Sequence, residues 1–342
     1  MLKKQLIVLV VALVIFAGGF FVGSRFFAVK NYRGILIRQG PQGLINPLLG
    51  CEVAPDQNEF TEFDNIESQI KKSVSGLINK QTVSDVSVYL RTLNSGRWIG
   101  INEDARFAPG SLLKVPVMIA YLKKQESDPE TLAQEIPYNS KDDRNLIESI
   151  KPSNYIIPGS VYTIADLLNY SIINSDNNAF YLLYKNLKSG EIDKIYSDLK
   201  VPPPPDNSNT TEANLDYLSA KIYFNFFRVF YNATYLNRGM SNKALDLLTK
   251  TEFEDGLVAG VPQGLKVAHK FGENSVVNVN ADGSTSIDSA ELHDCGIVYY
   301  PNHPYFICIM TKGTDFGKLK SAIKNISEVA YSQLDNYFKK SQ

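Results

Sequence analysis

The chain has 342 residues, of which 44% are hydrophobic and 21% are charged. This length suffices for two average domains or one large one, and the composition is that of a chain with a buried core rather than a disordered one. The formal net charge is −1, and no basic tract interleaved with aromatic residues occurs. We therefore expect no nucleic-acid partner.

The N-terminal segment is basic and then apolar. Residues 6–23 carry no charge, which is at the lower limit of length for spanning a bilayer. A long secretory signal peptide fits the same pattern, but the apolar run continues past the small residues 17–19. We favour an uncleaved membrane anchor over residues 1–25, with a signal peptide as the alternative. Residues 26–60 mix glycine, proline and polar residues, as a linker or stalk does.

Cysteine and histidine residues bear on metals and disulfides, and the chain has three of each. No Cys-x-x-Cys pattern occurs and the histidine spacing does not suit a metal, so we expect no metal site. Cys295 and Cys308 lie on two apolar runs joined by residues 301–304, which can pair as a hairpin. We favour two buried free thiols there, and a disulfide is the alternative.

Periodicity predicts a domain over residues 61–342 whose two ends form a sheet. Apolar residues recur at helical spacing over 63–78, and residues 86–101 alternate as a β-hairpin. The later elements are expected as strands at 265–270, 295–300 and 305–310, a polar excursion with a turn at 281–283, and a closing helix at 318–338.

The middle of the domain, residues 111–264, is predicted to be helical. Thr163 and Asp166 fit a capping box that opens a helix, and helices are also expected over 178–187 and 218–235. The fold class is therefore α+β, with an antiparallel sheet flanked by helices and an inserted all-helical subdomain. Its sheet subdomain comprises residues 61–110 and 265–342.

Of four Ser-x-x-Lys patterns, the one from Ser111 to Lys114 stands apart. It follows a turn that can present a helix N-terminus, and it precedes an apolar run that would bury the helix. Residues three apart share a helix face, so Lys114 can reach the Ser111 hydroxyl. The unpaired N–H groups of the first turn can stabilise an oxyanion. This pattern predicts a serine nucleophile with a lysine base.

Two further motifs follow in order. The Ser-Asp-Asn at 175–177 lies between two apolar helical stretches, where a connecting turn is the plain explanation. The Lys-Phe-Gly at 270–272 lies in an extended run, where an edge strand can present Lys270. A Lys-Ser-Gly at 188–190 is closer by letter to a Lys-Thr-Gly motif, but we interpret it as a helix C-cap.

Together the three motifs resemble those of the class A β-lactamase and penicillin-binding-protein superfamily. The resemblance covers residues 61–342 and implies a β-lactamase/transpeptidase-like fold without metal or organic cofactor. It implies a small-molecule β-lactam or a peptidoglycan peptide as substrate, a domain outside the cytoplasm, and a monomer. The resemblance implies that Ser111 is the nucleophile, Lys114 its base and Ser175 the proton relay. It implies that Lys270 binds the substrate carboxylate, that Asn177 binds the substrate amide, and that Gly272 and Glu273 also belong to the substrate-binding site. The N–H groups of Ser111 and Glu273 are implied to form the oxyanion hole.

Three residues depart from the family pattern. Phe271 replaces the hydroxyl residue between the lysine and the glycine, which removes a donor to a substrate carboxylate. Glu212 resembles the residue that activates the hydrolytic water, although a first-turn helix residue is an equal alternative. Tyr181 replaces an asparagine that buttresses the loop of that glutamate. These departures affect deacylation more than acylation.

Three functions follow, in decreasing order of preference. The first is a class A β-lactamase-type hydrolase that forms an acyl-enzyme through Ser111. The second is a penicillin-binding, D-Ala-D-Ala peptidase-like enzyme with slow deacylation. The third is a cell-surface binding module without catalysis, which the presence of Ser111, Lys114, Ser175 and Lys270 disfavours.

Overall fold

The structure is a computed structural model that describes residues 5, 43–46, 57–205, 215–279 and 285–340. The predicted anchor (apart from residue 5) and Glu212 lie outside these residues, and both remain predictions. Within the described part of the chain, no helix combines the length and apolarity needed to cross a membrane.

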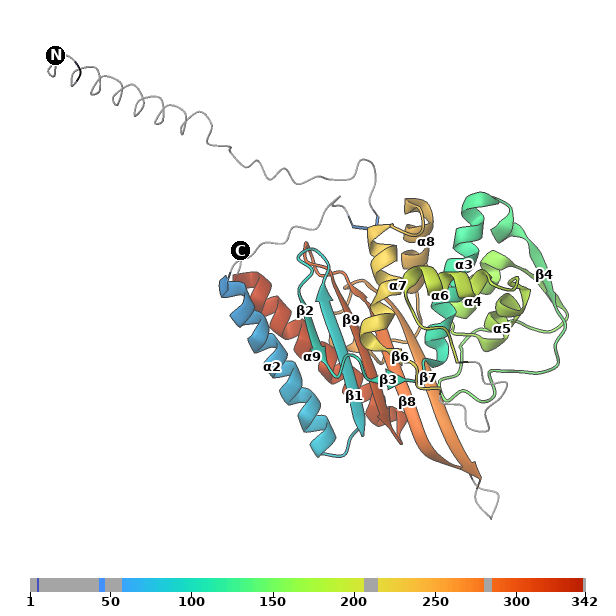
Figure 1. Cartoon of the computed structure of the whole chain (residues 1–342). Helices are drawn as coiled ribbons and strands as arrows, with labels where there is room; N and C mark the ends of the chain where they lie inside the picture. Colours follow the sequence, from blue (N-terminus) through green and yellow to red (C-terminus); the bar gives the residue numbers. More distant parts are fainter. Residues whose placement is uncertain (1–4, 6–42, 47–56, 206–214, 280–284, 341–342) are drawn as a thin grey trace. The chain divides into compact units, whose positions relative to one another are not determined.

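One antiparallel sheet joins the two ends of the domain, as predicted. Its strand order is β2-β1-β9-β8-β7, so the last strand of the chain, β9, pairs with the first, β1 (Figure 1). The register sets Val88 opposite Ile309. The strands are β1 (Asp85–Thr92), β2 (Trp98–Ile101), β7 (Val267–Val279), β8 (Thr285–Val298) and β9 (Tyr305–Gly313).

Helices cover both faces of this sheet. The long α2 (Gln57–Asn79) and α9 (Phe316–Lys340) lie side by side on one face (Figure 1). On β1, Val88 and Leu90 belong to the core under these two helices, whereas Tyr89 belongs to the core of the other face. Because successive side chains of a strand point to opposite faces, the strand is buried on both.

The inserted helical subdomain packs on the second face. Its helices are α3 (Lys114–Ser127), α4 (Ile164–Ile172), α5 (Asn177–Asn186), α6 (Glu191–Leu199), α7 (Ala220–Asn232) and α8 (Arg238–Leu248). Short elements connect them: β3 (Arg106–Phe107) with β6 (Leu218–Ser219), β4 (Glu135–Tyr138) with β5 (Ser160–Thr163), and the 3₁₀ turns η1 (Gly110–Leu113), η2 (Thr131–Ala133) and η3 (Val258–Gly260).

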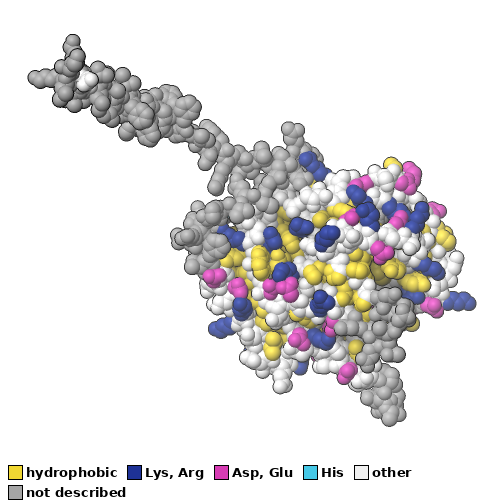
Figure 2. Space-filling model, viewed as in Figure 1, with side chains coloured by type: hydrophobic (Ala, Val, Ile, Leu, Met, Phe, Trp, Pro, Cys, Tyr) yellow, Lys and Arg dark blue, Asp and Glu magenta, His cyan; other side chains and the backbone are white. Residues whose placement is uncertain are grey.

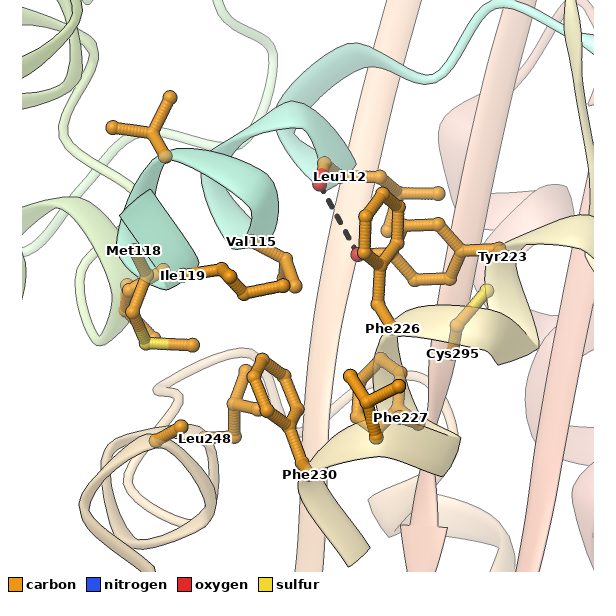
Figure 3. Close-up of a cluster of buried hydrophobic side chains, with 14 of the residues drawn as sticks. Leu112, Val115, Met118, Ile119, Tyr223, Phe226, Phe227, Phe230, Leu248 and Cys295 are labelled. Atoms are coloured by element: carbon orange, nitrogen blue, oxygen red, sulfur yellow. Dashed lines mark hydrogen bonds between the residues drawn. The ribbon is translucent and has the colours of Figure 1, made fainter. Parts of the chain in front are cut away.

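The aromatic helix α7 contributes many buried side chains to the core of this subdomain. Its Phe226, Phe227 and Phe230 pack in one cluster with side chains of α3 (Figure 3). Beside them, the Tyr223 hydroxyl donates a 3.1 Å hydrogen bond to the carbonyl of Leu112. This hydrogen bond fixes the backbone of Leu112, the residue that follows Ser111. The predicted capping box at Thr163 and Asp166 also forms and opens α4.

Two sequence expectations were wrong. The strands expected at 265–270 and 295–300 extend into the polar excursion, because β7 and β8 pair through Val279 and Thr285 in a hairpin of 13-residue and 14-residue strands. Its polar side chains are tolerated because this end of the hairpin is exposed. Cys295 and Cys308 are joined by a disulfide rather than free, because the β8–β9 register sets them directly opposite each other.

Part of the predicted stalk packs against the folded body. Ile45 is 2% exposed and belongs to the helical-side core. The Leu44 N–H donates to Asn242 Oδ1 at 2.7 Å, and the Asn46 N–H donates to the carbonyl of Tyr231 at 2.6 Å. On the face shown in Figure 2, acidic and basic side chains are interspersed, in keeping with the small net charge.

Candidate active site

The predicted nucleophile lies where η1 passes into α3. Ser111 is 8% exposed, and Gly110 before it has a φ of 51°, which glycine adopts without strain. A Cβ on Gly110 would lie 2.1 Å from the carbonyl oxygen of Glu273. The turn therefore packs directly on strand β7, and the backbones of the two predicted oxyanion donors, Ser111 and Glu273, come together.

Gly272 makes the same approach from the strand side. A Cβ there would lie 2.4 Å from the carbonyl oxygen of Pro109 and 3.0 Å from the amide nitrogen of Leu112. Both are backbone atoms that cannot move aside easily. The glycine of the Lys-Phe-Gly motif is thus required for the contact between β7 and the nucleophile turn.

Lys114 is the centre of the site. It is 1% exposed, and its Nζ lies 2.6 Å from Ser111 Oγ and 2.7 Å from Asn177 Oδ1. The same nitrogen lies 2.7 Å from the carbonyl oxygen of Ser175 and 3.0 Å from its Oγ. The first and second sequence motifs, 61 residues apart, therefore meet at one amine.

The environment of Lys114 favours the neutral amine. Burial lowers its pKa to about 8, against a partial opposing effect of nearby carboxylates that begins with Glu148. Four oxygen atoms surround this nitrogen. A neutral amine has two N–H donors and one lone pair, so it can accept a hydrogen bond from a serine hydroxyl. Lys114 can thus accept the Ser111 proton.

Lys270 completes a group that we call the lysine network, consisting of Ser111, Lys114, Ser175 and Lys270. Its Nζ donates to Ser175 Oγ at 3.0 Å and to the carbonyl of Phe271 at 2.9 Å. Lys270 is 0% exposed, and burial, followed by repulsion from Lys114, places its pKa well below the usual value. Ser175 Oγ therefore lies between two amines, where a proton relay needs it.

Phe271 fills space instead of offering a hydroxyl. It is 4% exposed, and its ring stacks on Phe253 with 4.4 Å between the ring centres. The Lys270 Nζ lies 4.0 Å from the centre of the same ring. The departure from the family motif thus replaces a polar contact by an aromatic core and a cation–π contact.

The residues of the Ser-Asp-Asn turn have different structural roles. Ser175 has a φ of 59°, a left-handed conformation that is uncommon outside glycine. Asp176, fully buried, receives hydrogen bonds at 2.8 Å from Asn145 Nδ2, the Ile156 N–H and the Asn178 N–H. It thereby ties the segment between β4 and β5, residues 139–159, to the motif. We call this segment the Glu148 loop.

Glu148 is a site residue that sequence reasoning missed. Its carboxylate accepts a hydrogen bond from Asn177 Nδ2, on the amide whose oxygen contacts Lys114. No motif surrounds this residue, and 26 residues separate it from Ser175 in the sequence. Only the packing of the Glu148 loop on the Ser-Asp-Asn turn brings it here, so no local signal could have identified it.

Two more residues hold the segment before the nucleophile. The buried Glu291 carboxylate accepts a 2.8 Å hydrogen bond from the Ala108 N–H. His293 Nε2 lies 2.9 Å from the Ala108 carbonyl oxygen. Strand β8 therefore holds both backbone groups of the residue three positions before Ser111.

The other residues singled out in the sequence lie outside this network. Lys188 is exposed. The predicted C-cap was wrong, because α5 ends at its C-cap Leu187 and Gly190, with a φ of 83°, is the N-cap of α6. Tyr181 is 37% exposed, and the Arg144 guanidinium lies 3.6 Å from its ring centre.

The sequence pattern of the Beta-lactamase enzyme family matches residues 65–334, which include every residue of the lysine network. The chain belongs to this family. The match extends from α2 into α9, so it spans both the sheet and the inserted helices of this β-lactamase family member.

Solved structures show the same fold. A mutant of PBP-A, in an acyl-enzyme complex with penicillin G, is 19% identical with a TM-score of 0.63, over 80% of this chain and 97% of that one. A class A β-lactamase representative from Bacteroides cellulosilyticus DSM 14838 is 17% identical with a TM-score of 0.64, over 79% and 99%. The class A β-lactamase from Mycobacterium abscessus is 20% identical with a TM-score of 0.63, over 78% and 99%. No curated protein sequence matches the chain significantly.

Proposed function

We propose that this β-lactamase family member is a serine hydrolase that opens β-lactam amides through an acyl-enzyme on Ser111. The observation that carries the proposal is the 2.6 Å distance from Lys114 Nζ to Ser111 Oγ, with the amine buried. A buried amine with a pKa of about 8 is a competent base near neutral pH. We further propose that the domain works outside the cytoplasm, behind the apolar segment of residues 1–25.

Acylation follows from the lysine network. Ser111 Oγ bonds to the carbonyl carbon while its proton passes to Lys114 Nζ. The N–H groups of Ser111 and Glu273 receive the developing oxyanion. As the amide C–N bond breaks, Ser175 Oγ gives its proton to the leaving nitrogen and is reprotonated from Lys114 or Lys270, each 3.0 Å away. Asn177 binds the side-chain amide of the substrate, and Lys270 supplies positive charge for its carboxylate.

Deacylation distinguishes the second candidate, a penicillin-binding peptidase-like enzyme. The comparison with PBP-A, whose variant is held as an acyl-enzyme with penicillin G, supports this alternative. Phe271 also supports this alternative. It lacks the hydroxyl that would donate to the carboxylate of a β-lactam, so the site is less well suited to β-lactam turnover. If Glu212→Gln traps an acyl-enzyme that the natural chain releases, Glu212 activates the hydrolytic water. This result would favour the β-lactamase over the peptidase-like enzyme.

Intact-protein mass spectrometry of the full chain with benzylpenicillin, followed over time, tests the proposal. A covalent adduct that forms and then disappears identifies a β-lactamase, and a persistent adduct identifies the peptidase-like alternative. Ser111→Ala must abolish either adduct. The absence of both an adduct and benzylpenicillin hydrolysis on the natural chain would overturn both candidates.

A further inference from the structure

Strand β8 binds both backbone groups of Ala108, three residues before the nucleophile. The Ala108 N–H donates to Glu291 Oε2 at 2.8 Å, and the Ala108 carbonyl oxygen lies 2.9 Å from His293 Nε2. Ala108, Glu291 and His293 are all buried, so solvent water does not compete for these two hydrogen bonds. The lysine network uses neither side chain, and the acylation chemistry leaves both unexplained.

The two partners of the His293 ring define its protonation form. A carbonyl oxygen only accepts, so Nε2 carries the hydrogen that the Ala108 carbonyl receives. On the other side of the ring, the Thr311 N–H donates to Nδ1 at 3.4 Å, so Nδ1 carries no hydrogen. His293 is therefore a neutral imidazole, protonated at Nε2, that connects strand β9 to Ala108.

The Glu291 carboxylate is oriented by a charge on the same neighbouring strand. Its Oε1 lies 2.9 Å from Lys312 Nζ, while its Oε2 receives the Ala108 N–H. The same Lys312 nitrogen lies 3.3 Å from Asp216 Oδ2. Because one carboxylate oxygen is fixed by the ammonium group, the other is directed at the backbone of Ala108.

The chain between Ala108 and Ser111 contains one residue with unusual freedom. Pro109 has a ring-restricted φ, but Gly110 has a φ of 51°, from which a glycine can turn at little cost. Beyond Ser111, the Leu112 carbonyl accepts the Tyr223 hydroxyl. Hydrogen bonds on both sides of Gly110 thus determine the direction of the Ser111 N–H, which the proposed acylation uses as an oxyanion donor.

We propose that His293 and Glu291 are positioning residues for the acylation of Ser111. They bind Ala108 and thereby keep the Ser111 N–H in the direction that receives the developing oxyanion. The inference rests on the proposed function and assigns a role in it to β8. Such a donor acts on the transition state, so its misdirection slows acylation without weakening the noncovalent binding of substrate.

Rapid-quench mass spectrometry of the full chain with benzylpenicillin tests this inference. It separates the acylation rate constant at saturation from the dissociation constant of the noncovalent complex. His293→Leu, which offers the Ala108 carbonyl no donor, should lower the rate constant about 100-fold and leave the dissociation constant unchanged. His293→Gln retains an N–H donor and should restore the rate constant to within about tenfold of the natural value.

Two controls distinguish positioning from other effects. His303→Gln, in the turn between β8 and β9, should acylate at the natural rate constant. In His293→Gln, the midpoint of the pH dependence should stay at about 8, because the base is Lys114. A shifted midpoint would show that His293 acts on the base and would overturn the positioning role.

A measurement without a variant covers the case in which His293→Leu does not fold. Nitrogen-15 NMR of the natural chain at neutral pH should show His293 protonated at Nε2 only, with His293→Gln assigning the signal. A ring protonated at Nδ1 could not accept the Thr311 N–H, and this result would overturn the inference.

The outcomes separate this inference from the proposed function. If benzylpenicillin acylates the natural chain and His293→Leu reacts at the same rate constant, the inference is wrong and the proposed function stands. The inference is also wrong if only the reactive fraction of His293→Leu falls, which is the result of a purely structural role. If the natural chain neither carries an adduct nor hydrolyses benzylpenicillin, the proposed function fails and takes the inference with it.

Discussion

The two sides of the candidate site differ in burial and in sequence origin. The lysine network is almost completely buried, with Ser111, the most exposed of its four residues, at 8%. The Glu148 loop on the other side is largely exposed, and Leu146 and Ile147 beside Glu148 are 73% and 83% exposed. The network comes from three ordered motifs, whereas the loop carries none.

We therefore expect the buried network and the exposed loop to have different roles. Burial lowers the pKa of both lysines, which is what proton transfer from a serine requires. The loop instead supplies the Glu148 carboxylate, which accepts a hydrogen bond from Asn177 and raises the pKa of the Lys114 base. We expect changes in the network to abolish acylation and changes in the loop to alter its pH dependence.

The largest effect is expected from Lys114→Ala. Loss of the base should lower the second-order rate constant of acylation by benzylpenicillin by about 10³-fold. Lys188→Ala, which removes the exposed lysine of the other Lys-x-Gly sequence, is the matched control and should leave this rate unchanged. A Lys114→Ala chain that acylates normally would show that another group is the base.

Gly272→Ala tests the contact between β7 and the nucleophile turn. The new Cβ would meet backbone atoms of Pro109 and Leu112, so the free energy of unfolding should fall by about 1–3 kcal/mol. In Gly76→Ala, on α2, the Cβ meets nothing within 4 Å, and the helix should gain up to about 1 kcal/mol. Urea denaturation measures both, and equal stabilities would contradict the close packing.

The pH dependence of acylation reports the lysine base. Because the neutral amine is the active form, the rate constant should rise about tenfold per pH unit below a midpoint of about 8 and level off above it. Glu148 opposes the lowering of this pKa, so Glu148→Gln should shift the midpoint to lower pH. An unchanged midpoint in that variant would show that the charge of Glu148 does not reach the base.

The smallest effect concerns Glu273. Its pKa is raised from 4.5 to about 8, so the folded chain binds more protons than the unfolded chain between these values. Stability should therefore decrease as the pH rises through this window, by at most about 1.4 kcal/mol per pH unit for one proton. Thermal unfolding of Glu273→Gln should show a flatter dependence between pH 5 and 8, and identical slopes would contradict the assignment.

The sequence allowed the fold class and the lysine network to be predicted because both rest on local patterns. Helical spacing revealed α2 and α9, and the three motifs marked Ser111, Ser175 and Lys270. What it missed depends on tertiary register. The Cys295–Cys308 disulfide follows from the pairing of β8 with β9, and Glu148 reaches Asn177 only through the packing of its loop.

We propose that Ser111, activated by Lys114, is the residue that becomes acylated. The most direct measurement is peptide mapping by mass spectrometry of the full chain after brief exposure to benzylpenicillin. We predict that the covalent adduct lies on Ser111 and is absent in Lys114→Ala over the same exposure. An adduct on another residue, or a natural chain that neither carries an adduct nor hydrolyses benzylpenicillin, would contradict it.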